Sequence, residues 1–161
     1  HGGGAEATLE PLSEHLDAYG AHLAQNFGSG VQACYRGPRW YDTAETRELV
    51  REWIGFYKQY RTVLDSDIIH VRRADGRDLD CMLHVNPKGH PCGLAMVYNP
   101  CDHVASKTLE LPLYYTGITD TAQIKEKDGP AASYRLDRTF HVEVPVEIPA
   151  RACTWFVIDG H

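Results

Sequence analysis

Apolar residues recur at two different spacings along this chain, and the change comes near Leu64. Up to Leu64 they lie three or four residues apart, which predicts an amphipathic helix over 11–25 and a longer one over 43–64. A short apolar run at 30–36 lies between the two helices and predicts a buried strand that ends before Gly37-Pro38. The longer helix has the broader apolar face, made of Leu49, Trp53, Phe56, Tyr57, Tyr60 and Leu64.

Residues at the helix starts agree with these boundaries. Pro11 stands at the first position of the first helix, where its missing N–H costs nothing. Asp42 and Glu45 are three residues apart at the start of the second helix, which is the spacing of a capping box. We therefore expect both helices to begin at these positions.

After Leu64 the apolar residues alternate with polar ones. The alternation predicts strands over 67–73, 78–85, 93–99, 104–111, 121–127, 140–148 and 153–158, separated by turns that contain Gly, Asn and Pro. Asp75-Gly76 marks the first hairpin turn, and Pro145 makes the strand at 140–148 an edge strand or an interrupted one. Short strands at this regular spacing indicate an antiparallel sandwich. The predicted class is α+β, with a helix-strand-helix segment over 1–64 followed by an antiparallel β-sandwich over 65–161.

The composition narrows the possible functions. Of 161 residues, 43% are hydrophobic and 24% are charged, which is typical of a folded globular protein. The net charge of −6 and the scattered Lys and Arg residues argue against nucleic-acid binding, because that needs a basic stripe. No apolar run approaches the roughly 20 residues that cross a bilayer, so no membrane partner is expected. Five cysteines without a CxxC pair favour free thiols and a cytoplasmic location, and no motif indicates a cofactor.

Several segments together resemble the C-terminal end of TIM-barrel glycoside hydrolases of the melibiase, or α-galactosidase-like, type. They are VREWIGFYKQYR, the ADGRD turn, GLAMVYNP, LPLYYTGITDTAQI and IPARACTWFVI. The resemblance implies that 30–36 is the last barrel strand, that 43–64 is the last barrel helix and that a sandwich follows directly. The catalytic carboxylates of that family lie on earlier barrel strands, and no positions of this chain correspond to them.

Two functions therefore stay open. The first is a carbohydrate-active protein that corresponds to the sandwich portion of such an enzyme and lacks its catalytic residues. We expect such a protein to self-associate through exposed apolar helix faces. The second is a small stand-alone glycosidase that hydrolyses O-glycosides with a pair of carboxylates. A third, weaker possibility is a sugar-binding module that uses Trp40, Tyr41 or the Tyr114-Tyr115 pair.

Candidate substrate-binding residues follow from the barrel interpretation. The C-terminal end of a barrel strand faces the ligand side, so Tyr35 and Arg36 are candidates for contacts with sugar hydroxyls. Trp40 and Tyr41 are candidates for stacking on a pyranose ring. In the alternative interpretation these two rings cover the barrel edge and Arg36 pairs with Asp42.

Candidate catalytic residues lie in the first hairpin. Asp78 and Asp80 are two residues apart on a strand and point the same way, roughly 6.5–7 Å apart, a separation that inverting glycosidases use. A solvated polar face explains the same spacing without catalysis, and we expect His84 of that strand to lie on the same polar face.

A metal site is not expected. His90, Cys92, Cys101 and His103 have suitable side chains for zinc, but they stand at opposite ends of a predicted strand, roughly 30 Å apart. His70 and His84 could meet across the first hairpin, although no carboxylate or thiol accompanies them.

Overall fold

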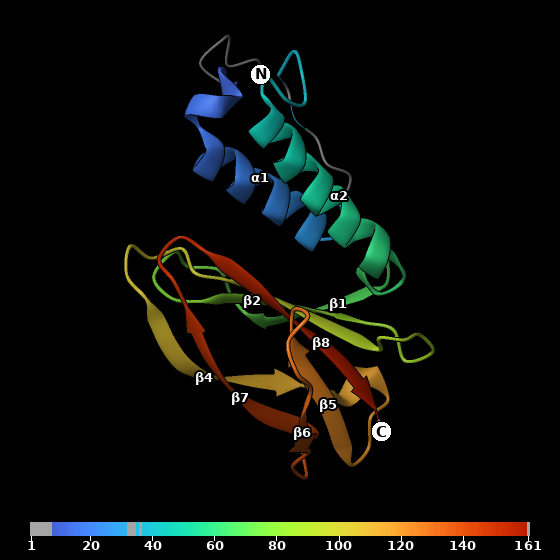
Figure 1. The fold of residues 1–161 in the computed structure, drawn as a ribbon. Coiled ribbons are helices and arrows are strands. Elements are labelled where there is room, and N and C mark those ends of the chain that lie inside the picture. The colour runs from blue at the N-terminus through green and yellow to red at the C-terminus, as the bar shows by residue number, and fades with distance from the viewer. Residues whose placement is uncertain (1–7, 32–34, 36, 161) are drawn as a thin grey trace. The chain divides into compact units, whose positions relative to one another are not determined.

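The computed structural model describes residues 8–31, 35 and 37–160, and it contains two α-helices followed by antiparallel sheets (Figure 1). The predicted α+β class is therefore confirmed. The chain divides into two compact units, His1–Arg61 and Thr62–His161. None of the helices in the described residues is long and apolar enough to span a membrane.

The first unit contains a 3-10 turn, η2 (Leu12–Glu14), the helix α1 (Leu16–Gly28) and most of the helix α2 (Ala44–Leu64). The single helix predicted over 11–25 is thus two elements, because His15 leaves the helical region at φ −130° and ψ 35°. Within this unit Gly20 lies against Leu49, and the rings of Phe27 and Tyr57 are 5.8 Å apart. These contacts pack α1 against α2.

The start of α2 is capped one residue later than predicted. The hydroxyl of Thr43 accepts a hydrogen bond from the Thr46 amide at 3.3 Å, and the Thr46 hydroxyl accepts one from the Thr43 amide at 3.0 Å. This reciprocal pair has the form of a capping box, so the predicted Asp42–Glu45 box is wrong. Asp42 instead accepts hydrogen bonds from the amide and hydroxyl of Ser13, at 3.1 and 3.0 Å, and so links α2 to η2.

The apolar face of α2 is buried as the periodicity predicts. Trp53, Phe56 and Tyr60 are each less than 9% exposed, and their rings stack along the helix with centroids 5.3 Å apart. Of the strand predicted over 30–36, residues 32–34 and 36 lie outside the described residues. Gly30, Val31 and Tyr35 have no strand pairing.

The described residues of the second unit, 62–160, form eight strands in two sheets. The strands are β1 (Asp67–Arg72), β2 (Asp80–Val85), β3 (Gly93–Tyr98), β4 (Ala105–Pro112), β5 (Thr121–Glu126), β6 (Ala132–Arg135), β7 (His141–Ile148) and β8 (Cys153–Gly160). Six of them form an antiparallel sheet in the order β1-β2-β3-β8-β5-β6, and β4 pairs with β7 in a separate layer (Figure 1). A 3-10 turn, η3 (Tyr114–Thr116), joins β4 to β5.

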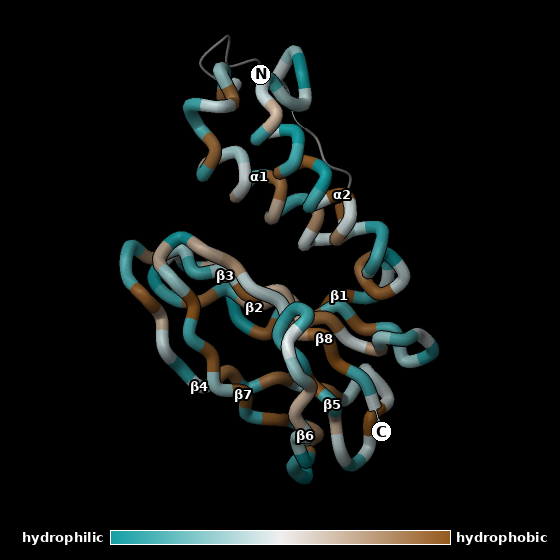
Figure 2. Tube along the Cα trace, viewed as in Figure 1, coloured by the Kyte–Doolittle hydropathy of each residue, from teal (hydrophilic) through white to brown (hydrophobic). Residues whose placement is uncertain are grey.

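The core of this unit lies between the two sheets. It joins residues such as Leu83 and Phe156 of the larger sheet to Leu111 and Val144 of the smaller one. Along β7 the buried and exposed residues alternate, and Figure 2 shows the matching change from hydrophobic to hydrophilic positions. Burial of each such side chain contributes about 1.5–3 kcal/mol to folding.

Three details of the second unit differ from the sequence predictions. The strand β6 was missed, because its four residues are mostly exposed and show no clear alternation. His84 is fully buried, so its assignment to a polar face is wrong. His70 and His84 are diagonal neighbours rather than direct cross-strand partners, since His70 pairs with Met82 and His84 pairs with Ile68.

Candidate functional site

Asp78 lies at the first hairpin of the second unit, just before β2, and both of its carboxylate oxygens are engaged. One oxygen forms an ion pair with Lys107 of β4 and lies 3.7 Å from the guanidinium of Arg72. The other accepts a hydrogen bond from the Leu79 amide at 2.8 Å. The hydrogen bond from Lys107 is the main reason why the pKa of Asp78 is below its usual value of 3.8. Asp78 is therefore ionised and neutralised by its neighbours at neutral pH.

Asp80, the first residue of β2, has the opposite environment. Burial is the main cause that raises its pKa above 3.8, and the nearby negative charge of Asp75 raises it further. Within the described part of the chain its Oδ1 is buried and accepts no hydrogen bond. A neighbouring pair of carboxyls with pKa values shifted in opposite directions is what acid–base catalysis uses. However, the ion pairs of Asp78 hold that carboxylate in the hairpin, where it stabilises the turn.

Tyr35 lies in an aromatic cluster of the first unit. Its ring is 5.2 Å from that of Tyr19, 6.0 Å from His22 and 6.2 Å from Trp40. Burial is the main cause of the raised pKa of the Tyr35 hydroxyl. Burial likewise raises the pKa of Tyr19 to about 12, and its hydroxyl donates to the Trp40 carbonyl at 2.7 Å. This cluster brings two of the predicted sugar-contacting residues, Tyr35 and Trp40, together.

The other predicted binding residues are arranged less closely. Trp40 and Tyr41 are 44% and 49% exposed, so part of each ring is open to solvent. The guanidinium of Arg47 lies 5.8 Å from the centre of the Tyr41 ring, a cation–π distance that occupies one ring face. Arg36 lies outside the described residues, and so does its predicted pairing with Asp42.

The four residues considered for zinc stand apart in the second unit. His90 and Cys92 precede β3, whereas Cys101 and His103 follow it. Among residues 8–31, 35 and 37–160, no group of three or more His, Cys, Asp or Glu side chains could hold a metal ion.

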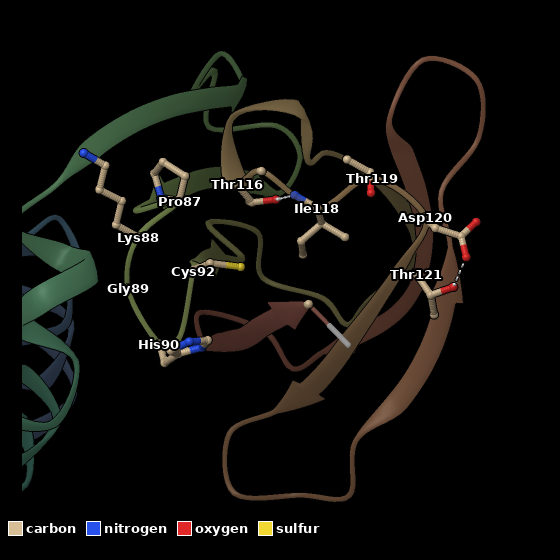
Figure 3. A pocket seen from close by; sticks show the side chains of 12 residues that line it. Pro87, Lys88, Gly89, His90, Cys92, Thr116, Ile118, Thr119, Asp120 and Thr121 are labelled. Carbon is tan, nitrogen blue, oxygen red and sulfur yellow. Dashed lines mark hydrogen bonds between the residues drawn. The ribbon is translucent and has the colours of Figure 1, made fainter.

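A pocket of about 380 Å³ lies in the second unit, and sequence reasoning missed it. Two loops and the end of β8 form its wall (Figure 3). In Figure 3 Cys92 and Ile118 point into the hollow, and Lys88 and Asp120 lie at its sides. The lining residues are Pro87, Lys88, Gly89, His90, Cys92, Thr116, Gly117, Ile118, Thr119, Asp120, Thr121 and Gly160.

Hydrogen bonds hold the loops of this pocket in place. The Thr116 hydroxyl donates to the Leu113 carbonyl at 2.6 Å, and the Asn86 amide donates to the Cys92 carbonyl at 2.9 Å. Gly117 has a left-handed φ of 81° and lies beside Pro87, so any larger residue there would be strained. The pocket is thus largely pre-formed.

The chemistry of the pocket suits binding better than nucleophilic attack. Cys92, His90 and Asp159 are residue types found in thiol-dependent enzymes, and His90 Nδ1 lies 3.3 Å from Asp159 Oδ1. Yet the Cys92 thiol donates to the Ile158 carbonyl at 3.5 Å, and burial raises its pKa. Because the thiolate is the nucleophile, this protonated thiol is unreactive at neutral pH.

The only sequence signal for this pocket is the composition of two loops, NPKGHPC and TGITDT, both rich in turn residues. Nothing in either loop shows that they meet. They come together because β8 lies between β3 and β5 in the sheet, which places the ends of strands distant in sequence side by side.

Comparison with solved structures finds a similar fold within a larger protein. A protein from Bacillus halodurans C-125 assigned as an α-N-acetylgalactosaminidase superposes with a TM-score of 0.57 at 14% identity, over 88% of this chain. The chain spans 30% of the length of that protein. At this identity the similarity establishes the fold alone.

Two structures of AmyP, one with maltose and one of an E221Q variant with maltotriose, both have TM-scores of 0.46. Their identities are 8% and 7%, over 79% and 94% of this chain and 24% and 36% of theirs. These scores are too low to add to the fold assignment. Neither the family models nor the curated proteins give a match to the sequence.

Proposed function

We propose that this chain is the sandwich-bearing portion of a carbohydrate-active protein related to glycoside hydrolases, and that it has no catalytic pair of its own. The observation that carries the proposal is the fold shared with the Bacillus halodurans protein over 88% of the chain. The engagement of both Asp78 oxygens supports its second half. Glycoside hydrolysis needs two carboxyls that flank a bound sugar, and Asp78 is instead ion-paired within the hairpin.

One observation favours the alternative of a small stand-alone glycosidase. The pKa of Asp80 is raised and that of Asp78 is lowered, as an acid and a base would require. In that role Asp80 would protonate the leaving-group oxygen, and Asp78 would activate a water on the opposite face of the sugar. Asp78 would first have to leave Lys107 and Arg72.

An assay of glycoside hydrolysis distinguishes the two functions. We expect the purified chain to release no nitrophenol from a panel of α- and β-aryl glycosides, including an α-galactoside and an N-acetyl-α-galactosaminide, between pH 4 and pH 8. A thermal unfolding transition in the same preparation confirms that the protein is folded.

The variants Asp78→Asn, Asp80→Asn and Asp128→Asn complete the experiment. Asp128 is the control, since it is an exposed carboxylate of the turn after β5. Turnover that disappears in the first two variants and survives in the third would establish the alternative and refute the proposal.

A further inference from the structure

Two neighbouring tyrosines of the second unit expose most of their rings. Tyr114 is 61% exposed and Tyr115 is 59% exposed, on the short turn η3 between β4 and β5. Large exposed aromatic groups on a folded protein commonly mark binding surfaces. Tyr114 also contacts Phe140, and we call Tyr114, Tyr115 and Phe140 the aromatic platform.

The aromatic platform is held in one arrangement. Tyr114 and Tyr115 form an edge-to-face pair with centroids 5.1 Å apart, and Tyr114 meets Phe140 edge-to-face at 5.3 Å. The residues on either side of the tyrosine pair, Leu113 and Thr116, are buried and fix the turn to the core. Rings fixed in this way lose little side-chain entropy when a ligand binds.

The backbone of Phe140 has a strained conformation, and the turn that contains it helps to hold the aromatic platform in place. Phe140 has φ 63°, which a bulky residue rarely adopts. Asp137 maintains the turn by accepting hydrogen bonds from the amides of Thr139 and His141 at 2.8 and 2.9 Å. The Leu113 amide donates to the Phe140 carbonyl at 2.8 Å, so the turn that contains Phe140 is joined to η3.

A polar hollow is lined in part by His141, which directly follows Phe140 of the aromatic platform in the sequence. The hollow has a volume of about 380 Å³ and is lined by Glu110, Tyr134, Arg135, Asp137, His141, Val142 and Glu143. Glu110 and Glu143 are direct cross-strand partners on β4 and β7, and His141 Nε2 lies 3.7 Å from Glu110 Oε1. The Arg135 side chain is 85% exposed, and its Nε lies 3.7 Å from Asp120 Oδ1. Carboxylates and a guanidinium therefore line one hollow, which His141 connects to the aromatic platform along the chain.

We propose that the aromatic platform and this hollow form a binding site for a pyranoside, separate from any catalytic centre. The proposal rests on the carbohydrate relationship proposed above and adds the site and its residues. One tyrosine ring stacks against the apolar face of a sugar ring, and the other flanks its edge. Glu110 and Glu143 accept hydrogen bonds from sugar hydroxyls, and Arg135 donates to them.

The mixed polarity of the site selects this class of ligand. Each sugar hydroxyl is both a donor and an acceptor, so a neutral sugar can satisfy carboxylates and a guanidinium together. A protein partner would have to supply matched charges for each of them, because an unpaired buried charge is costly. A small neutral ring with many hydroxyls is the simplest occupant.

The test is an NMR titration of the full chain with methyl α-galactopyranoside, N-acetylgalactosamine and maltotriose. We expect at least one of these sugars to shift the signals of η3 and of the first residues of β7. The variant Tyr114→Ala/Tyr115→Ala should weaken that binding by about tenfold or more, and Glu110→Gln by about threefold. The variant Trp40→Ala/Tyr41→Ala tests the competing aromatic pair of the first unit. The control is Val104→Ala, at an exposed apolar residue of the second unit, which should change the dissociation constant by less than about twofold.

Three results would overturn the proposal. The first is that none of the three sugars binds. The second is binding that depends on Trp40 and Tyr41 rather than on the tyrosine pair, which would leave the carbohydrate relationship intact and move the site. The third is a wild-type dimer that the Tyr114→Ala/Tyr115→Ala variant converts to a monomer without any effect of sugar. Hydrolysis of aryl glycosides would refute the non-catalytic function and leave this site unaffected.

Discussion

Replacement of Asn99 by alanine should destabilise the second unit far more than the loss of one polar side chain usually does. Asn99 is 3% exposed and stands directly after β3. Its amide nitrogen donates to the carbonyls of His103, Ile148 and Pro149 at 2.8, 3.0 and 2.9 Å. Its Oδ1 accepts a hydrogen bond from the Cys101 amide at 3.0 Å. One side chain thus joins the end of β3 to the end of β7.

The expected loss of stability comes from the backbone groups that lose their hydrogen-bond partner when Asn99 is replaced by alanine. The carbonyl of Ile148 is in the interior, so water cannot replace its lost donor, and such an unsatisfied group costs about 1–3 kcal/mol. The bonds to His103 and Pro149 are partly exposed, and water restores part of their energy. With the lost bond to Cys101 added, we expect Asn99→Ala to lower the free energy of unfolding by about 2–4 kcal/mol.

The matched control is Asn86→Ala, in the same unit. Asn86 also donates to a carbonyl, that of Thr62 at 3.2 Å, and accepts from the Lys88 amide at 3.2 Å, but both bonds are exposed. We expect a loss of about 0.5 kcal/mol there, because water replaces both bonds. Urea unfolding followed through the amide signals of β7 reports the second unit alone. Equal losses in the two variants would refute the argument from burial.

Three further predictions follow from the ionisable groups. Asp78→Asn should lower stability at pH 7 and have a smaller effect at pH 3. The stabilisation by a carboxyl with a lowered folded-state pKa is complete well above 3.8 and is lost as the pH falls through the folded-state pKa. Asp80→Asn should raise stability at pH 7 but not at pH 3, because a carboxyl with a raised folded-state pKa costs stability only as the pH rises above 3.8. Urea unfolding of both variants at the two pH values measures these changes in stability. Equal losses of stability in the two variants at pH 7 would contradict both predictions. Cys81 and Cys92 should resist alkylation by iodoacetamide at pH 7 until urea is added. Burial raises the pKa of both thiols, that of Cys81 to about 12, so neither forms the reactive thiolate in the folded chain. Peptide mapping that finds either cysteine modified in the folded chain would disprove this prediction.

Much of the fold could be predicted because hydrophobic periodicity is a local signal. The helix that ends at Leu64 and the strands β1 to β5 were predicted to within about two residues of their bounds, since each contains a clear period of 3.6 or 2. The strand β6 was missed because its stability comes from pairing with β5 rather than from its own pattern. His84 was misplaced for a related reason, since β2 and β3 are buried on both faces and alternation fails there.

The candidate site was harder to predict because partners distant in sequence decide its chemistry. Spacing alone offers Asp78 and Asp80 as a catalytic pair, because the separation expected along a strand suits inverting hydrolysis. What distinguishes the two carboxyls is Lys107, which lies 29 residues from Asp78 and reaches it only because β4 folds back near the first hairpin. A carboxylate that a lysine neutralises is a poor base, whatever its spacing. Knowledge of that one ion pair changes the interpretation of Asp78 from catalysis to stability, and the contrast between Asp78→Asn and Asp80→Asn measures this difference directly.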